Sequence, residues 1–323
     1  MKEYIVGPND VGQRLDRFVK KVAPRLPDSL LQKTLRKKDI KINGHPAKGD
    51  ARLEKGDTVR IYLTDELLEG TKAPAPVKSR PVKLSVAYED ENILIVDKKP
   101  GVLCHDAEGW SPTTLIAEIQ AYLRQKGEWR PEEENSFAPA LCNRIDRNTG
   151  GLVIAAKNAE ALRIMDEKIK NREIEKYYLC VVLGAPKPAR GRLEGFLFKD
   201  AKKNQVYVYD EPRLGALSAV TEYRTLANRG ELSLVECHLI TGRTHQIRAH
   251  LASIGHPLLG DGKYGTNALN KGTGFDKQAL CSYRLRFAFT DDAGELEYLN
   301  GREFRLEDVW FADAFRRGEI SKE

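Results

Sequence analysis

The chain has 323 residues, of which 41% are hydrophobic and 31% charged, and its 53 Lys and Arg exceed its 47 Asp and Glu by six. This length suggests two domains, and the composition is that of a folded protein, neither disordered nor fibrous. The longest apolar runs, such as residues 93–96 and 152–156, are far shorter than the roughly 20 residues of a membrane helix, and residues 1–10 carry no apolar signal core, so we expect a cytoplasmic protein.

The positive charge is confined to the N-terminal fifth of the chain. Residues 1–65 contain 15 Lys and Arg against 9 Asp and Glu, whereas the remaining 258 residues contain 38 of each. A charge run is more often a solvated surface than a binding site, but a compact segment that carries the whole excess favours a polyanionic partner.

Within this basic segment the sequence predicts two helices followed by two strands. The expected elements are helices over residues 13–22 and 29–38 and strands over residues 40–42 and 59–63, with a hairpin turn at Asn43-Gly44. Asp28 or Ser29 can cap the second helix, which ends in the basic residues Arg36, Lys37 and Lys38.

Residues 66–80 lack periodicity, contain two Ala-Pro steps and are typical of a linker. A second set of predicted elements follows. We expect strands over residues 84–88, 93–96, 152–156, 177–183, 219–226, 232–240 and 281–289, and helices capped by Asn158 and over residues 244–254. Many strands with few interleaved helices predict an α+β fold with a mixed, mainly antiparallel sheet. We place this second domain at residues 81–310 and a C-terminal tail at residues 311–323.

The cysteines and histidines do not match a metal-binding pattern. No two of the five cysteines are closer than 38 positions, so we interpret them as free thiols of a reducing compartment. His238, His245, His250 and His256 cluster in sequence, but their spacing fits no known metal site and no Cys or acidic ligand accompanies them. We expect no metal and no cofactor.

Two segments are dense in polar residues. Residues 143–151 (NRIDRNTGG) lie between apolar runs and place Asp146 near Arg144 and Arg147, which favours an ionised carboxylate that can act as a nucleophile or a base. From the spacing alone, we favour the simpler interpretation of a surface turn with a local ion pair. Residues 241–248 (TGRTHQIR) join a predicted strand to a helix and concentrate donors suited to a phosphate or a base edge.

A third segment, Lys176-Tyr177-Tyr178, begins a predicted strand. A tyrosine in such a place usually packs in the core with its hydroxyl at the surface. It would take part in chemistry only if it faced the loop of Asp146.

In this order the three segments resemble the RluA-like family of pseudouridine synthases. The similarity covers about residues 81–290 and is carried by residues 88–101 (YEDENILIVDKKPG), 143–153 (NRIDRNTGGLV), 173–182 (EIEKYYLCVV) and 239–265 (LITGRTHQIRAHLASIGHPLLGDGKYG). Residues 1–65 are similar to the S-four-like (alpha-L) RNA-binding module of ribosomal proteins. The resemblance implies an isomerase that flips a uridine out of RNA, breaks its glycosidic bond and rejoins the base through carbon 5.

The resemblance also implies roles for individual residues. Asp146 would be the nucleophile or base, Arg248 would hold it in a salt bridge, and Tyr178 rather than Tyr177 would stack on the target base. Arg144 would fill the gap left by the flipped base. The remaining residues expected to contact RNA are Thr149, Arg243, His245 and Gln246 at the active site and Arg36, Lys37 and Lys38 in the N-terminal module. Asn143 and Gly150 depart from the family, in which many members have His and Ser.

The expected partner is RNA, in particular large-subunit ribosomal RNA, and we expect a monomer that does not bind membranes. Two other functions are compatible with the sequence. One is a non-catalytic RNA-binding or ribosome-assembly protein that keeps the fold. The other is a hydrolase that uses Asp146 together with the histidine cluster.

Overall fold

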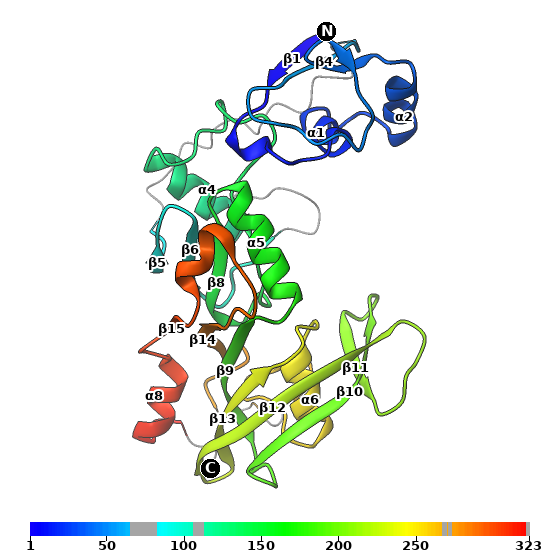
Figure 1. Ribbon diagram of the computed structural model, residues 1–323. Coiled ribbons are helices and arrows are strands. Elements are labelled where there is room, and N and C mark those ends of the chain that lie inside the picture. Colours follow the sequence, from blue (N-terminus) through cyan, green and yellow to red (C-terminus); the bar gives the residue numbers. More distant parts are fainter. Residues whose placement is uncertain (65–82, 106–112, 267–269, 271–272, 321–323) are drawn as a thin grey trace.

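The computed structural model describes residues 1–64, 83–105, 113–266, 270 and 273–320 (Figure 1). The expected linker at residues 66–80 lies outside this described part of the chain. The described residues form two sheets, one of four strands near the N-terminus and one of eleven strands. No helix among the described residues is long and apolar enough to span a membrane.

The N-terminal unit contains the helix, helix, strand, turn, strand order that the sequence predicts. Its elements are β1 (Lys2–Ile5), η1 (Pro8–Asp10), α1 (Leu15–Val22), α2 (Asp28–Arg36), β2 (Ile40–Ile42), β3 (His45–Pro46) and β4 (Thr58–Ile61). The strand order is β1-β4-β2-β3, and Asn43 and Gly44 both have positive φ in the tight turn between β2 and β3. Leu15, Phe18 and Val19 on one face of α1 are buried in the core of this unit.

The start of α2 differs from the expected cap. Pro27 occupies the N-cap position, with no side-chain hydrogen bond, and Asp28 is the first helical residue. Proline is compatible with this position because its backbone is extended there (φ −61°, ψ 146°) and the helix needs no N–H from the residue before its first turn. Asp28 then interacts favourably with the positive end of the helix dipole.

The larger sheet is mixed and mainly antiparallel, as predicted. Its strands are β5 (Val86–Glu89), β6 (Ile93–Lys98), β7 (Ala140–Leu141), β8 (Gly150–Ala156), β9 (Ile174–Leu183), β10 (Arg190–Asp200), β11 (Gln205–Tyr209), β12 (Ala216–Arg229), β13 (Leu232–Leu239), β14 (Leu280–Phe287) and β15 (Glu303–Arg305). The main path runs β11-β10-β12-β13-β9-β14-β8-β6-β5. Only β14 and β8 pair in parallel among the described strands.

Helices cover this sheet and explain why its central strands are continuous apolar runs. They are α4 (Leu115–Gln125), α5 (Ala159–Lys170), α6 (Gln246–Ser253), α8 (Trp310–Arg317) and the 3₁₀ helix η2 (Gly294–Leu299). Alternate residues of β8 enter different clusters: Val153 packs with residues of α4 and α6, and Ile154 packs with residues of α5 and η2. A strand buried on both faces needs no polar alternation.

The C-terminal segment is not a tail throughout. Residues 310–317 form α8, and Phe311, Phe315 and Ile320 are buried in the cluster that includes Leu179 of β9. The expectation of a tail at residues 311–323 is therefore wrong for residues 311–320, because a pair of aromatic residues four positions apart gives this short helix an apolar face.

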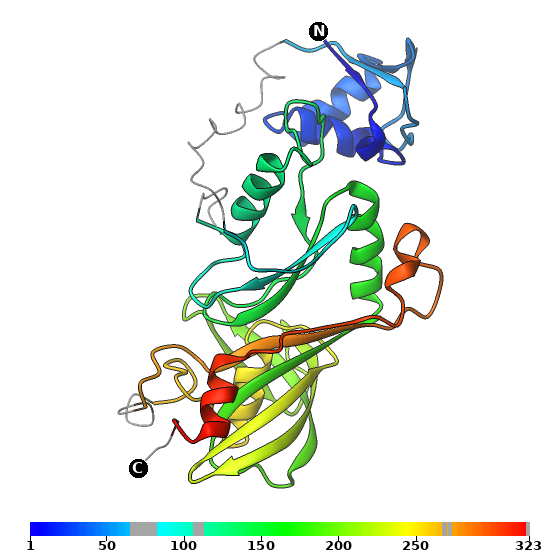
Figure 2. The ribbon, with the colours of Figure 1, turned by 90° about the vertical axis from the view of Figure 1, so that its left-hand side faces the viewer.

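The N-terminal unit lies over one end of the larger sheet, with α4 below it on one side and α5 on the other (Figure 2). The buried Asp10 of η1 accepts hydrogen bonds from Asn135 Nδ2 (2.8 Å) and Ser136 Oγ. Asn9 Oδ1 accepts from Ala159 N at the start of α5 (3.0 Å). Polar contacts of this kind fix the two units relative to each other in the structure.

Candidate active site

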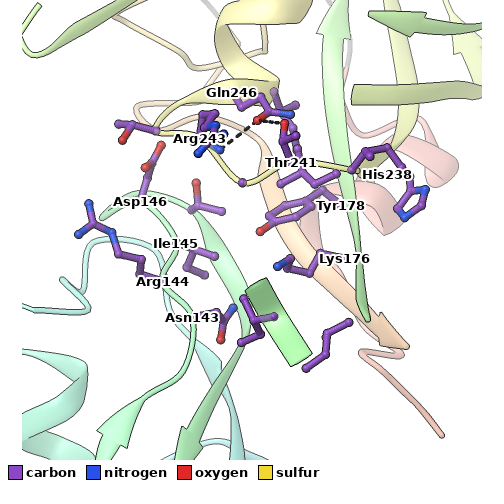
Figure 3. A pocket seen from close by; sticks show the side chains of 18 of the residues that line it. Asn143, Arg144, Ile145, Asp146, Lys176, Tyr178, His238, Thr241, Arg243 and Gln246 are labelled. Carbon is purple, nitrogen blue, oxygen red and sulfur yellow. Dashed lines mark hydrogen bonds between the residues drawn. The ribbon is translucent and has the colours of Figure 1, made fainter. Parts of the chain in front are cut away.

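A cavity of about 810 Å³ opens where three segments of the larger sheet meet. They are the loop between β7 and β8, the first half of β9, and the segment that joins β13 to α6. Figure 3 shows side chains from all three pointing into this space. The three polar segments singled out in the sequence therefore meet at one site, which is large enough for a ligand of nucleoside size.

Asp146 lies in the loop between β7 and β8, at the edge of the cavity. A turn closes here because Thr149 N donates to Asp146 O (3.0 Å). The buried Lys98 at the end of β6 also restrains the loop, because its ammonium group donates to Arg147 O (3.0 Å) and, outside the loop, to Val102 O (2.8 Å). Asn143 Oδ1 accepts from Ile154 N (2.7 Å). The carboxylate is thus carried by a loop with many backbone restraints.

Arg248 of α6 binds two carboxylates at once. Its Nη1 donates to Asp146 Oδ2 (3.1 Å), while Nε and Nη2 donate to the two oxygens of Asp261 (2.7 and 2.9 Å). Burial would lower the pKa of Arg248, but its hydrogen bonds to Asp261 and the negative charges of Asp261 and Asp146 raise that pKa on balance. The guanidinium therefore stays charged and holds Asp146 at a fixed position.

Asp261 is the residue that the sequence analysis missed. It is buried, and Oδ1 also accepts from the backbone N of Lys263 (2.9 Å) and Tyr264 (3.2 Å). Burial would raise the pKa of Asp261, but the pairing with Arg248 lowers it. The signal in the sequence was an acidic residue flanked by Gly260 and Gly262 within residues 239–265, one of the segments that carry the family resemblance.

Tyr178, and not Tyr177, lines the cavity. The two side chains lie on opposite faces of β9, and Tyr177 stacks on His238 with ring centroids 4.4 Å apart. Burial raises the pKa of Tyr178, which stays protonated near neutral pH. Figure 3 shows its hydroxyl pointing towards the loop that carries Ile145 and Asp146.

His245 lies beside the nucleophile candidate in a left-handed backbone conformation (φ 54°) at the start of α6. Its Nε2 is 3.8 Å from Asp146 Oδ2, and its Nδ1 is 2.9 Å from the hydroxyl of Tyr264. That hydroxyl also accepts from Val206 N. Burial lowers the pKa of His245 to about 4, so the ring is neutral at pH 7.

Gln246 does not have the expected freedom to bind a substrate. Its Oε1 accepts from Thr241 Oγ1 (2.8 Å) and Arg243 N (3.0 Å), and its Nε2 donates to Val220 O and Thr221 Oγ1 (both 2.9 Å). With both donors and both acceptor positions used, this buried amide stabilises the loop before α6 and has no capacity left for RNA.

The other expected contact residues differ in their access to the cavity. Arg243 lines it, although its Nε donates to Ser218 O (3.1 Å). Thr149 also lines it but is buried, with Oγ1 accepting from Gln278 Nε2 (3.3 Å). Arg144 is exposed at the mouth. Arg36, Lys37 and Lys38 belong to the N-terminal unit and are exposed there.

The histidines of the second segment do not converge on a common point. His250 Nδ1 is 2.9 Å from Thr221 Oγ1, His256 Nδ1 is 2.9 Å from Leu183 O, and His238 stacks on Tyr177. Among the described residues, no group of three or more His, Cys, Asp or Glu side chains could hold a metal ion. Only His245 is within reach of Asp146, so the hydrolase that uses several histidines has no matching arrangement here.

The site combines a restrained carboxylate, a guanidinium partner and an aromatic ring within one cavity. A carboxylate in this setting can attack an electrophilic carbon or remove a proton. A tyrosine ring in the cavity wall can pack against a planar base. The geometry thus fits chemistry on a nucleoside that enters from the exposed side of the cavity.

Comparisons with known proteins agree with this chemistry. The family model of RNA pseudouridylate synthase matches residues 92–253. An uncharacterised RNA pseudouridine synthase of Chlorobaculum parvum is 30% identical over 85% of this chain and 86% of its own length. Ribosomal large subunit pseudouridine synthase C of Vibrio cholerae is 30% identical over 92% of this chain and 91% of its own length. The protein of the same name in Escherichia coli is 29% identical, with coverages of 89% and 88%.

Solved structures share the fold. Human RNA pseudouridylate synthase domain containing 4 superposes with a TM-score of 0.57 at 19% identity, covering 74% of this chain and 94% of that one. Human RNA pseudouridylate synthase domain containing 1 gives a TM-score of 0.52 at 20% identity, covering 76% and 100%. At these identities the similarity concerns the fold.

Proposed function

Because this chain belongs to the RNA pseudouridylate synthase family, we propose that it isomerises uridines of large-subunit ribosomal RNA, with Asp146 as the reacting carboxylate. The protein is an RNA pseudouridine synthase, an isomerase that moves the attachment of a uracil from N1 to C5. The large-subunit target is supported by relatives at 29–30% identity whose names state it.

The observation that supports Asp146 most directly is its ion pair with Arg248 at the edge of the cavity, 3.1 Å from Oδ2 to Nη1. The target uridine must leave its stack to reach this carboxylate, at a cost of a few kcal/mol. The exposed Arg144 at the cavity mouth is suited to fill the gap in the RNA. Tyr178 is suited to pack against the flipped uracil.

In the proposed reaction Asp146 either attacks C1′ or removes a proton from the ribose, and the C1′–N1 bond breaks. The uracil turns within the cavity, and its C5 bonds to C1′, while the Asp146–C1′ bond of the first route breaks or Asp146 returns the proton to the ribose in the second. Loss of the C5 proton and gain of a proton at N1 complete an isomerisation that consumes no second substrate. Arg248 keeps the carboxylate charged and oriented when RNA excludes water from the site.

The test is to incubate the full chain with unmodified transcripts of large-subunit ribosomal RNA, small-subunit ribosomal RNA and transfer RNA, and to map pseudouridine in each. We expect product in the large-subunit transcript, and a rate at least about 1,000-fold lower for Asp146→Asn, which keeps the shape but not the charge. A wild-type chain that binds the transcript without forming pseudouridine would instead identify a non-catalytic RNA-binding or assembly protein.

We further propose that residues 1–65 are an S-four-like RNA-binding module and that residues 81–310, together with α8, are the catalytic domain. Support comes from the charge of the module and from the exposure of Arg36, Lys37 and Lys38 at the end of α2. These cations also complement the negative end of the helix dipole, so their loss would affect both the helix and RNA binding.

Salt dependence tests this role. Replacing all three cations with Gln should weaken RNA binding and reduce the slope of log K against log salt by about two units, because fewer counterions are released from the RNA. Arg316→Gln with Arg317→Gln, at exposed positions of α8, is the control and should leave the slope unchanged. An unchanged slope in the triple variant would remove these residues from the interface.

We also infer that the protein acts as a cytoplasmic monomer. The cavity is lined by residues of one chain, so a single copy contains the whole proposed site. The proposed substrate, ribosomal RNA, supports the compartment. A sedimentation measurement at the concentration of the activity assay tests the oligomeric state.

A further inference from the structure

Lys176 is a cationic residue of the cavity that the reaction described above does not use. It lies two positions before Tyr178 on β9, so both side chains project from the same face of the strand. Both line the cavity. Figure 3 shows the Lys176 amine beside the Tyr178 ring, with the amine and the tyrosine hydroxyl directed into the same space opposite Ile145.

The ammonium group of Lys176 has no protein partner in the described part of the chain. Other poorly exposed lysines are paired: Lys168 with Glu173 (2.9 Å) and Lys157 with Glu89 (3.2 Å). Lys98 donates to three backbone carbonyls. None of the hydrogen bonds and ion pairs between described residues involves Lys176 Nζ. A desolvated cation without a partner is costly, and burial lowers its pKa.

An unpartnered ammonium group in a cavity gains a partner when a negatively charged or carbonyl-bearing substrate binds there. The C1′–N1 bond of the uridine breaks with both electrons remaining on N1. The detached uracil is therefore an anion, with its charge shared by N1 and the two carbonyl oxygens. We propose that the Lys176 ammonium binds a carbonyl oxygen of the flipped uracil and stabilises the negative charge that develops there. This inference rests on the proposed pseudouridine synthase reaction.

The position of Lys176 favours the base over the RNA backbone as its partner. It lies next to the ring proposed to pack against uracil, whereas the exposed cations among the described residues of the same cavity are Arg144, Lys170 and Arg172. The ammonium keeps its proton throughout, so the step balances whether Asp146 attacks C1′ or removes a ribose proton. Preorganised donors aimed at developing charge are a major source of catalysis.

The first experiment separates the chemical step from binding. Under single-turnover conditions with saturating enzyme, Lys176→Met should slow pseudouridine formation at least about 100-fold while its Kd for RNA stays within about twofold of wild type. Lys176→Arg should recover part of the rate because it keeps the charge. Lys199→Met, which removes an exposed lysine of β10 outside the cavity lining, is the matched control and should leave the single-turnover rate unchanged.

A second experiment tests charge on the uracil directly. Fluorine at C5 makes uracil a better leaving group, so its anion needs less stabilisation. With 5-fluorouridine at the target position, the ratio of C1′–N1 cleavage rates between wild type and Lys176→Met should shrink. A purely structural effect of the substitution would slow both substrates equally. Lys176→Gln provides the same comparison if the Met variant does not fold.

The outcomes are distinct. Weaker RNA binding with a smaller salt slope and an intact single-turnover rate would assign Lys176 to a phosphate and overturn the proposal. An unchanged rate and affinity would also overturn it, while leaving the proposed function intact. A wild-type chain without pseudouridine synthase activity would refute the proposed function itself, before any Lys176 variant is compared.

Discussion

Asp146 is held in place by Arg248, and Arg248 is in turn held by Asp261. The second pair is the tighter one, with two short bonds between the guanidinium and both carboxylate oxygens. Because Arg248 and Asp261 are both buried, neither can exchange its partner for water without a large cost. Asp261 therefore acts on the reaction through Arg248, as a positioning residue.

Asp261→Asn should impair activity and stability together. The amide cannot balance the buried guanidinium, so we expect the free energy of unfolding to fall by about 3 kcal/mol and the single-turnover rate to fall about 100-fold as Arg248 and Asp146 shift. Urea unfolding and pseudouridine formation measure the two effects. The control is Asp313→Asn, which removes the charge from an exposed pair with Arg316. Wild-type rates in Asp261→Asn would exclude the positioning role.

Buried histidines should make the fold sensitive to mild acid. Burial lowers the pKa of His250 from 6.5 to about 4. Between these values the unfolded chain binds a proton that the folded chain excludes, so the free energy of unfolding should fall as the pH falls from about 6.5 to about 4. Burial also lowers the pKa of His245 to about 4, so this residue adds to the same loss of stability in mild acid.

Urea unfolding at several pH values tests this dependence. His250→Gln cannot take up the proton, so it should flatten the decline while His245 maintains part of it. Equal declines in wild type and His250→Gln would show that His250 titrates normally in the folded protein.

The sequence was sufficient to single out Asp146, Tyr178 and Arg248, because the resemblance covers the segments in which they lie. It was insufficient for Gln246 and Asp261. A glutamine in a donor-rich segment resembles a ligand-binding residue until its four hydrogen-bond partners are known, and two of these lie on β12, more than 20 residues earlier in the chain. The role of Asp261 depends on its burial beside Arg248, which no local pattern reports.

Among the elements, prediction succeeded where burial gives a regular pattern. The strand expected at residues 152–156 is part of β8, which is buried throughout. The strands β10 and β11 were missed, since most residues of β10 are not buried and its glycines interrupt the alternation. The helix α8 was missed because its apolar face consists of little more than two phenylalanines. Short or exposed elements depend on tertiary contacts that a local pattern does not contain.

Two adjacent glycines at the start of β8 should respond differently to the same substitution. Gly151 has φ +110°, and a Cβ there would lie 2.6 Å from Ser282 N of β14. We expect Gly151→Ala to lower the free energy of unfolding by about 3 kcal/mol or more, because strain and overlap act together where β8 and β14 pair.

Gly150→Ala is the matched comparison. Its Cβ would lie 3.2 Å from the ring of Pro100, a side chain that can yield slightly. The loss should be under about 1 kcal/mol. Urea unfolding of both variants measures the difference, and similar losses would contradict the argument from strand pairing.

For the whole molecule, the fixed position of the N-terminal unit is the feature that the sequence could not indicate. Composition separates a basic module from a neutral domain, but the hydrogen bonds between them come from single polar groups in and around η1, in residues 134–136 and at the start of α5. Residues of this kind are common on solvated surfaces. Their pairing across the interface appears only in the folded structure.

Asp10→Ala should release the N-terminal unit while leaving both folds intact. The substitution removes the acceptor for Asn135 Nδ2, Ser136 Oγ and Gly7 N, and leaves these donors to water. We expect a larger radius of gyration in small-angle scattering, since a freed module samples more distant positions. RNA affinity should fall, because two contact surfaces at variable spacing bind less cooperatively than two held at a fixed one.

The single-turnover rate of bound RNA should not change, as Asp10 lies far from the cavity lining. Asp50→Ala, at an exposed position of the same unit, controls for the loss of one negative charge. That loss alone makes the module more basic and would strengthen RNA binding, so weaker binding by Asp10→Ala together with a larger radius of gyration supports release of the interface. Unchanged scattering together with unchanged or tighter binding would show that the docked arrangement does not depend on Asp10.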